Sequence, residues 1–425
     1  MQILLPYGSS TLPFDLPERN LLALASPNPV KLVADPVAEI RRALSEPVGA
    51  PRLSEAARGA LRVVIAADDM TRQTPVEIII PALLDELNDA GVADEQVTVL
   101  IALGTHRYMT ESEIGEHFGL EVVRRVQVLN NPWRDPDQMV DLGTTSNDTP
   151  LSVSRIALDA DFLIGVGSVV PHHIPGYSGG AKIVQPGLTG AVTTGATHFF
   201  STRAPRSYLG QEENPVRSEM ERIAAQVGLK AILNVVLDSS GGLVQALYGD
   251  FIQAHRAGVA VSRHVYGVDL PGLADIVVAG SHPCDIEFWQ AHKSLYPAEM
   301  AVRQGGTIIV VTPCPEGVSM THQDILKVTG LPPDEIQARI LDGSIPDVVS
   351  GALALAWSKV RQHARVSLVS GGITDADGRA LGFTPFASLE AALADAFQCQ
   401  GADAQVTVLT HAPDTLPRIA NGAQG

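Results

Sequence analysis

Short runs of aliphatic and β-branched residues alternate with longer segments of helical periodicity through most of this 425-residue sequence. The β-rich runs are almost continuously hydrophobic, which is typical of parallel strands that helices cover on both faces. The alternation therefore predicts an α/β fold with mostly parallel sheets. Because a chain of this length exceeds what one hydrophobic core usually supports, we expect two α/β domains.

The first half has the pattern of repeated strand–helix–strand units. We expect its helices over residues 75–90 and 251–264, and its strands over residues 61–67, 96–102, 161–170 and 231–238. In the second half, helices separate strands expected over residues 274–280, 307–311, 366–369 and 405–409. Glycine and proline interrupt the periodicity at 266–273, so we expect an N-terminal domain of residues 1–268 and a C-terminal domain of residues 269–425. After His411 we expect a short ordered end and then a frayed one.

Charge and composition exclude several classes of function. With 47 acidic and 30 basic residues, the formal net charge of −17 argues against nucleic acid or an anionic membrane as the main partner, although a small anion needs only local cations. Three cysteines without CxxC spacing indicate a reducing compartment and no thiolate zinc site. The sequence has no signal peptide pattern and no long apolar run, so we expect a soluble, cytoplasmic protein.

The segment PHHIPGYSGGAKIVQPG, residues 171–187, follows the strand expected at 161–170 and reads as an active-site loop. Glycine-rich turns let backbone N–H groups converge on a ligand, and Lys182 can act as a point charge or as an amine nucleophile. The loop is not a P-loop, because Ala181 precedes the lysine and Ile183 follows it. Ser178 lacks the Gly-x-Ser-x-Gly frame of a serine hydrolase.

Two other expected strands end in polar residues, at DDMTRQTP and LGTHRYM. Ligand sites in open α/β sheets lie at the carboxyl ends of strands. Asp69 and Arg72 could bind an anion or orient a ligand there, and a helix-capping aspartate with a solvated arginine is an equally good interpretation. The sequence has no HxH, HExxH or HxxxH pair that could hold a metal from a single helix or strand. It also has no GxGxxG motif after an expected strand, which a dinucleotide site would show.

Histidines and a second-half helix complete the candidates. His106, His172, His173 and His198 lie near these strand ends and the glycine turn. Taken alone, each is better interpreted as a surface or structural histidine, and their clustering makes a shared pocket a stronger alternative. Gln290 and Lys293 lie three residues apart in SHPCDIEFWQAHKSL, so on a helix they share a face that could reach an interdomain cleft. From the residues alone, an exposed amphipathic helix is the preferred interpretation of this pair.

Taken together and in order, DDMTRQTP, ALGTHR, PHHIPGYSGGAKIVQPG, GATH and WQAHKSL closely resemble the motifs of the nickel-dependent lactate racemase family. The resemblance extends from LPYGSSTL near the N-terminus to AQVTVL near the C-terminus. It implies two α/β domains with the active site in the cleft between them. It also implies a nickel pincer nucleotide, a nicotinic acid derivative whose pyridinium carries a thioamide and a thiocarboxylate that hold the metal.

The resemblance implies a role for each matching residue. On the cofactor side, Lys182 matches the lysine that forms the thioamide link, and His198 matches the imidazole that completes the nickel coordination. A lysine can also serve as a purely electrostatic partner, so a cofactor held without a covalent link is the alternative at Lys182. The remaining residues expected around the cofactor are Asp69, Ser178, Gly179 and Gly180. On the substrate side, His106 and His172 match the acid/base pair. The residues expected to bind the substrate are Arg72, Gln290 and Lys293.

This chemistry suits a 2-hydroxy acid, whose Cα hydrogen is very weakly acidic beside a carboxylate. One histidine would take the hydroxyl proton while hydride moves to the cofactor, and return of the hydride to the other face of the planar 2-keto acid would invert the centre. Two imidazoles suit these steps, since an unperturbed pKa of about 6.5 lets one be neutral and the other protonated near neutrality. Arg72 and Lys293 would hold the carboxylate meanwhile.

We therefore expect a racemase or epimerase of a 2-hydroxy acid that depends on cofactor biosynthesis proteins. Ala181, His173 and Trp289 differ from the residues that relatives can carry at these positions. The positions lie where substrate size and polarity would be recognised, so lactate is one candidate substrate and sugar acids are others. Two alternatives stay open. A non-catalytic binding protein for the cofactor or a nucleotide would show no turnover, and a metal-dependent hydrolase would be inactivated reversibly by a chelator.

Overall fold

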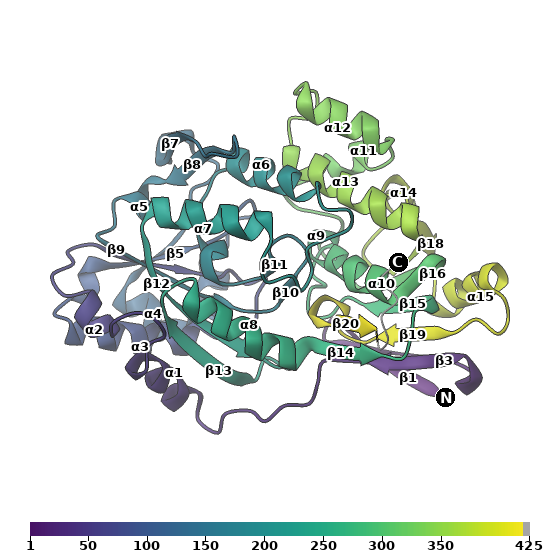
Figure 1. The fold of residues 1–425 in the computed structure, drawn as a ribbon, viewed down its shortest axis with the longest axis horizontal. Coiled ribbons are helices and arrows are strands. Elements are labelled where there is room, and N and C mark those ends of the chain that lie inside the picture. Colours follow the sequence, from purple (N-terminus) through teal and green to yellow (C-terminus); the bar gives the residue numbers. More distant parts are fainter. Residues whose placement is uncertain (420–425) are drawn as a thin grey trace.

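A computed structural model describes residues 1–419, and the frayed end expected after the last ordered segment lies outside the described residues. The described chain forms two α/β halves, each built around a six-stranded sheet (Figure 1). This confirms the fold class predicted from the alternating pattern. None of the helices in residues 1–419 is long and apolar enough to cross a membrane.

The first sheet has the strand order β13-β12-β9-β4-β5-β6, and every neighbouring pair is parallel except β12 and β13. Its strands are β4 (Val63–Ala67), β5 (Val97–Ile101), β6 (Gln127–Asn130), β9 (Phe162–Ser168), β12 (Leu229–Leu237) and β13 (Leu243–Gly249). The helices of this half are α1 (Pro36–Ser45), α2 (Leu53–Ala56), α3 (Val76–Asp89), α4 (Glu111–Arg125), α5 (Arg155–Leu158), α6 (Ala191–Ser201), α7 (Pro215–Val227) and α8 (Gln253–Tyr266).

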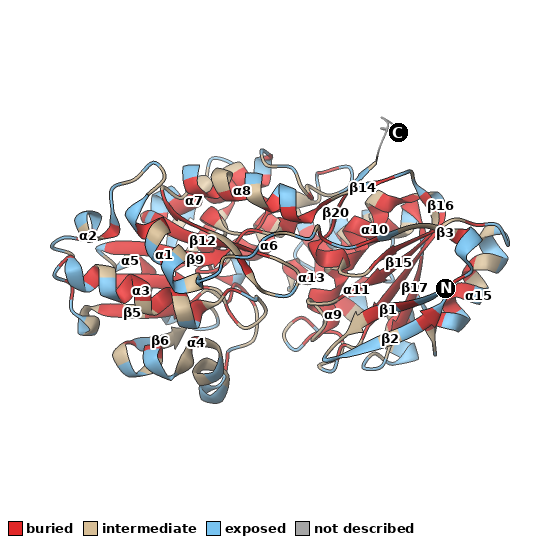
Figure 2. Ribbon diagram, turned by 90° about the horizontal axis from the view of Figure 1, so that it is seen from below, coloured by how far each residue is buried: buried red, intermediate tan, exposed pale blue. Residues whose placement is uncertain are grey.

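Helices bury both faces of this sheet. Alternate residues of β4 enter different cores: Val63 and Ile65 pack with residues of α1, α3 and α4, whereas Val64 packs with α7 and with the 3-10 turn Gly180–Ile183. All residues of β4 and β9 are buried (Figure 2). A strand covered on both faces needs a continuous apolar run, which is why the sequence predicts these two strands well.

The second sheet has the order β18-β17-β16-β15-β19-β3, and all its pairs are parallel. Its strands are β3 (Leu21–Ala25), β15 (Ala274–Gly280), β16 (Val302–Thr312), β17 (Arg365–Ser370), β18 (Thr384–Phe386) and β19 (Val406–Leu409). The helices of this half are α9 (Phe288–Ala291), α10 (Leu295–Ala301), α11 (Ile325–Val328), α12 (Pro333–Leu341), α13 (Val348–His363), α14 (Asp375–Ala380) and α15 (Leu389–Gln400).

The N-terminal segment belongs with the second sheet, which the expected division at residue 268 did not anticipate. Strand β3 pairs with β19, and the hairpin of β1 (Gln2–Tyr7) and β2 (Ser10–Asp15) packs its apolar residues against the same half (Figure 1). A further parallel pair joins β14 (Gly267–Leu270) to β20 (Leu416–Ile419). A two-stranded hairpin is at best marginally stable alone, so β1 and β2 pack against the second half, and β3 completes a sheet made otherwise from the other end of the chain.

The two halves contact each other near the carboxyl ends of their strands. Helix α6 packs on α13, and Lys359 of α13 donates hydrogen bonds to the backbone oxygens of Thr202 and Ala204. The first half also contains two short antiparallel strand pairs. They are β7 (Met139–Thr144) with β8 (Pro150–Ser154), and β10 (Pro171–His172) with β11 (Gly176–Tyr177). The β10–β11 pair shapes the loop that follows β9.

Candidate active site

A cavity of about 80 Å³ lies between the halves, at the carboxyl ends of β4, β5 and β9. Three loops of the first half reach it, and the start of α9 closes it from the second half. It brings together every residue that the sequence predicts for the site except Gly180. The predicted residues that line it are Asp69, Arg72, His106, His172, Ser178, Gly179, Lys182, His198, Gln290 and Lys293.

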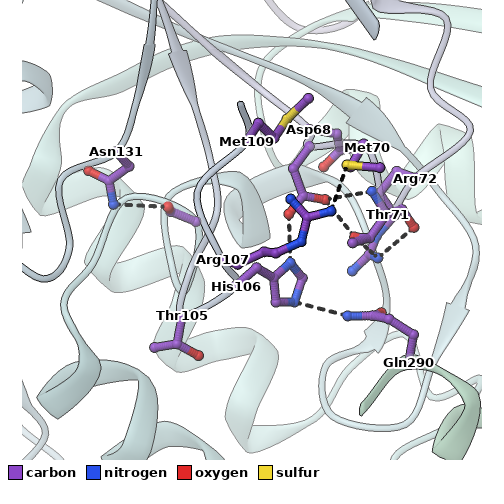
Figure 3. A network of polar contacts seen from close by, with 12 residues as sticks. Asp68, Met70, Thr71, Arg72, Thr105, His106, Arg107, Met109, Asn131 and Gln290 are labelled. Carbon is purple, nitrogen blue, oxygen red and sulfur yellow. Dashed lines mark hydrogen bonds and ion pairs between the residues drawn. The ribbon is translucent and has the colours of Figure 1, made fainter. Parts of the chain in front are cut away.

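A hydrogen-bonded chain crosses the cleft through His106 (Figure 3). The Nδ1–H of His106 donates to Asp69 Oδ2 at 2.6 Å, and Gln290 Nε2 donates to His106 Nε2 at 3.2 Å. Lys293 Nζ donates to Gln290 Oε1, so the amide can turn only its nitrogen toward the histidine. His106 is thus held as the tautomer whose Nε2 lone pair faces the cleft.

Asp69 is a buried acceptor and does not cap a helix. Its Oδ1 accepts hydrogen bonds from the backbone N–H and the hydroxyl of Thr71, while α3 begins after Pro75 with no side-chain cap. Burial opposes its ionisation, but His106 and Arg72 outweigh that effect and hold the pKa of the Asp69 carboxyl well below its usual range. A fixed carboxylate behind an imidazole orients the ring and stabilises its protonated form.

Cations dominate the floor of the cavity, although the whole protein is acidic. Burial, followed by repulsion from Arg72 and Lys293, lowers the pKa of the Lys182 amine to about 7. Burial and Arg72 likewise lower the pKa of Lys293 to about 8. Gln290 is 2% exposed, so the exposed amphipathic helix preferred from the residues alone is wrong. Such a group of cations suits a ligand that brings negative charge.

Three carbonyl oxygens of the loop over 171–187 are held by one buried arginine. The guanidinium of Arg217, on α7, donates to the backbone oxygens of Pro175, Tyr177 and Gly179. Helix α7 begins with Asn214 accepting from the Arg217 N–H and with proline at its first position, which places Arg217 in the first turn, under the loop.

Two further side chains fix the glycine turn itself. The Asn234 side chain of β12 accepts a hydrogen bond from the Gly180 N–H at 2.7 Å, and the His255 ring of α8 donates to the backbone oxygen of Ser178 at 2.9 Å. Gly180 has φ 58°, and a Cβ there would lie 2.8 Å from the His255 ring, so only glycine fits. The loop is therefore rigidly supported from beneath.

The support uses groups that a phosphate-binding turn would keep free. The Ser178 hydroxyl donates to Ser168 O at 2.6 Å, its N–H donates to Val170 O, and the Gly180 N–H is taken by Asn234. Gly180 also lies outside the cavity lining. Cofactor contact by Ser178, Gly179 and Gly180 therefore stays a prediction, and the structure gives Ser178 and Gly180 a role in holding the loop.

His172 and His173 follow each other but lie in different surroundings. His172 Nδ1 accepts from the Ile174 N–H at 3.2 Å, which leaves the ring proton on Nε2. Burial, then the charge of Lys182, lowers the pKa of His172 well below its ordinary value, so the ring is neutral near pH 7. His173 stacks between His172 and Tyr296, with ring centroids 4.7 and 4.1 Å apart, and thus links the site to α10.

His198 has the geometry of a metal ligand. Its Nδ1–H donates to Thr194 O at 2.8 Å within α6, so its unprotonated Nε2 is presented in a fixed orientation. Burial lowers the pKa of His198 to about 4, which keeps that nitrogen free of a proton at neutral pH. Residues 1–419 contain no group of three or more His, Cys, Asp or Glu side chains that could hold a metal, so a metal at His198 would need donor atoms from another molecule.

Comparison with known proteins assigns the family. Residues 7–210 match the family model described as the lactate racemase N-terminal domain, and residues 271–414 match the lactate racemase C-terminal domain. Lactate racemase from Thermoanaerobacterium thermosaccharolyticum is 33% identical over 321 residues, which is 74% of each chain. The chain belongs to the lactate racemase family. A second lactate racemase, from Lactiplantibacillus plantarum, is 30% identical over 74% of this chain and 75% of its own.

Solved structures agree with this assignment. The lactate racemase apoprotein from T. thermosaccharolyticum superimposes with a TM-score of 0.87 at 28% identity, over 98% of this chain and 100% of that one. A protein from Thermotoga maritima shares the fold alone, with a TM-score of 0.73 at 19% identity over 90% and 98% of the two chains. Family membership makes the chain an isomerase of the racemase class.

The sequence did not reveal one interdomain contact of this lactate racemase family member. His322 Nε2 lies 2.9 Å from the hydroxyl of Thr105, beside His106, and His322 Nδ1 lies 2.8 Å from Asp347 Oδ2. Trp289 stacks on the His322 ring at 4.1 Å. His322 and Asp347 stand in no recognisable motif, and the neighbouring helix start at Asp347 was the available local signal.

We predict that the Lys182 amine loses its proton at an unusually low pH in the protein without bound cofactor. Its rate of acetylation by acetic anhydride should rise with pH through a midpoint near 7, because burial and repulsion by neighbouring cations disfavour the protonated amine. Free Nα-acetyl-lysine in the same tube provides the reference, with a midpoint of about 10.4. Peptide mass spectrometry measures both. Arg72→Gln should move the Lys182 midpoint upward, and a wild-type midpoint above about 9 contradicts the prediction.

Proposed function

We propose that this chain interconverts the two hands of lactate or a related 2-hydroxy acid with the help of a nickel pincer nucleotide. The family assignment supports racemisation. The observation that supports the rest of the proposal is the set of groups that line one cavity. They are two imidazoles held as different tautomers, a third imidazole with a free nitrogen, and a buried amine. A simple binding site has no need of this combination.

His106 is proposed as the base that takes the hydroxyl proton. Its Nε2 faces the cleft without a proton, and the ionised Asp69 behind it stabilises the imidazolium that forms. When a substrate hydroxyl displaces the Gln290 amide, the same lone pair can accept the proton. The proton is then held at His106 Nε2 until an oxygen takes it back.

His172 is proposed as the partner on the other side of the substrate. In the described state its Nε2 carries the ring proton and can donate a hydrogen bond to a substrate oxygen. Its low pKa keeps the ring neutral when His106 takes up the proton. The surroundings thus prepare two residues of the same type for different tasks, which a racemase needs for substrates of opposite hand.

Arg72 and Lys293 are proposed to bind the substrate carboxylate. Both line the cavity, and neither forms an ion pair within 4.0 Å among the interactions of residues 1–419. A bidentate guanidinium contact would fix the carboxylate while the planar keto acid turns its other face. Trp289, which is 5% exposed, lines the same cavity.

The residues present also fit the proposed cofactor. His198 offers one unprotonated nitrogen, which suffices for a metal whose other donors come from the nucleotide, and Lys182 offers a buried amine with a pKa of about 7. When bound, the nickel pincer nucleotide supplies a hydride acceptor, a function for which proteins have no side chain. The excess of cations would hold its negative charges.

The test is metal analysis with intact-protein mass spectrometry on protein produced together with the enzymes that build the cofactor. We expect one nickel per chain and an added mass that Lys182→Ala abolishes, and His198→Ala should lose nickel while keeping the added mass. The matched control is Lys230→Ala at an exposed position. The proposal also requires the loaded protein to invert lactate or another 2-hydroxy acid in a chiral assay.

Each alternative has its own outcome. A folded protein that takes up no nickel and no nucleotide from a verified supply would overturn the cofactor assignment. Loaded protein that inverts none of a panel of 2-hydroxy acids would leave the binding-protein alternative. Reversible inactivation of a hydrolytic activity by a chelator would favour the metal-dependent hydrolase.

A further inference from the structure

A second and larger cavity, of about 240 Å³, opens beside the one that holds Lys182 and His198. The two share Arg72, His172, Gln290 and Lys293, which are the residues proposed to meet the substrate. The second cavity then extends away from Lys182 and His198. Its far wall is built from Leu237, Tyr266, His282, Cys284, Pro413 and Asp414.

This volume is more than lactate needs. An apolar cavity of about 150 Å³ takes up benzene, a molecule of six heavy atoms, which is also the number in lactate. With its carboxylate on Arg72 and Lys293, lactate would fill the shared end and leave the far wall without contact. The remaining space matches about three further heavy atoms on the same scale.

Asp414 is the notable group on the far wall. It ends the 3-10 turn Ala412–Asp414 after β19 and is only 6% exposed. Burial raises the pKa of its carboxyl to about 6, against the charges of Lys293, His282 and Arg72, and no hydrogen bond contributes to that pKa. A buried carboxylate without a donor is costly, so the cavity is built to receive one.

The neighbours of Asp414 leave it as the main acceptor of the far wall. The Tyr266 hydroxyl already donates to Leu237 O, and His282 Nδ1 is engaged with Asp285. Burial raises the pKa of the Cys284 thiol, which keeps it neutral and a weak partner. The rest of this wall is contributed by the apolar Leu237 and Pro413.

We propose that the cavity selects 2-hydroxy acids that are longer than lactate and carry hydroxyl groups beyond C3, with Asp414 accepting a hydrogen bond from one of them. The proposal rests on the proposed function, since Arg72 and Lys293 must hold the carboxylate. About nine heavy atoms fit the space, which corresponds to a four-carbon acid with a hydroxyl on each carbon beyond C1. A second carboxylate would face Asp414 at close range, so hydroxy diacids are disfavoured by repulsion.

Three probes test the proposal with the nickel-loaded protein: lactate, 2-hydroxyhexanoate and erythronate (2,3,4-trihydroxybutanoate). The last two have the same number of heavy atoms, and only erythronate has a hydroxyl beyond C3 to donate. We expect kcat/KM for inversion at C2 to be at least about tenfold higher for erythronate than for 2-hydroxyhexanoate, as one hydrogen bond to a charged group supplies. Equal values, or a preference for 2-hydroxyhexanoate, overturn the proposal.

Variants locate the preference at Asp414. Asp414→Leu should reverse it in favour of 2-hydroxyhexanoate, and Asp414→Asn should reduce it while keeping the shape of the wall. The quantity compared is the ratio of the two kcat/KM values within each variant, because Asp414 also acts on the charge of Lys293 and its loss can change the inversion of every substrate. The matched control is Asp403→Asn, an exposed aspartate of the same half. An unchanged preference in Asp414→Asn and Asp414→Leu counts against the proposal.

The design separates the two hypotheses. Inversion of lactate without inversion of erythronate keeps the proposed function and rejects the substrate class. If the loaded protein inverts no probe, the proposed function fails, and calorimetry then tests the cavity alone. Erythronate must bind wild-type protein at least about tenfold more tightly than Asp414→Asn, and equal affinities reject the cavity proposal as well.

Discussion

Replacing His106 with alanine should lower kcat for the inversion of lactate by about 10²–10⁴-fold, which is the usual contribution of a positioned acid or base. The loss arises because no other group takes over the proton from the hydroxyl, and Asp69 loses the ring that it orients and that favours its ionised form. Nickel content and added mass should stay as in the wild-type protein, since His106 is not expected to hold the cofactor. Chiral chromatography of the reaction mixture measures the rate.

The companion variant Asp69→Asn tests the tautomer. An amide can present its N–H to His106 Nδ1, which would move the ring proton to Nε2 and block the lone pair that faces the cleft. We expect kcat to fall in this variant too, with a smaller change in KM. His264→Ala, at an exposed position on α8, is the control. Retention of more than about a tenth of the wild-type kcat in His106→Ala would refute its role as base.

Replacing Arg217 with methionine should destabilise the protein by about 3–5 kcal/mol, a range typical of breaking a buried charged contact. The change removes the donor of three buried carbonyl oxygens without leaving a large cavity. The loop over 171–187 should loosen first. Hydrogen–deuterium exchange of this loop and urea-induced unfolding measure the two effects.

The comparison for this variant is Arg41→Met, an exposed arginine on α1 that should change the unfolding free energy by less than about 0.5 kcal/mol. We also expect Arg217→Met to take up less nickel, because His172 and Lys182 lie in the loop that Arg217 holds. If exchange in 171–187 stays at the wild-type rate, the loop is supported by something other than the guanidinium.

Local sequence predicted the part of the site that strands deliver. Asp69, His106 and His172 each follow a buried apolar run, and parallel strands bring their carboxyl ends to one edge. The strands and the positions of these loops follow from that pattern. The reaction did not follow from that pattern, because a lone lysine or histidine fits several chemistries. Assigning the reaction required the ordered set of motifs.

Long-range contacts were beyond the sequence for a physical reason. Arg217, His255 and His322 act on loops that lie 38 to 217 residues away, and nothing in their own neighbourhood marks them. Asp414 is likewise an ordinary residue of a 3-10 turn until the cavity surrounds it. Such roles come from tertiary packing, which hydrophobic periodicity does not encode.

The pairing of β3 with β19 has a consequence for the order of events during synthesis. The edge strand of the second sheet leaves the ribosome among the first residues, yet its partner is made only after residue 405, when the first sheet has been complete for more than a hundred residues. Because domains fold as their chain emerges, the N-terminal hairpin and β3 must wait beside a folded first half with their apolar faces uncovered. A chaperone that shields this segment during translation would act at the stage when the apolar faces of the segment are uncovered.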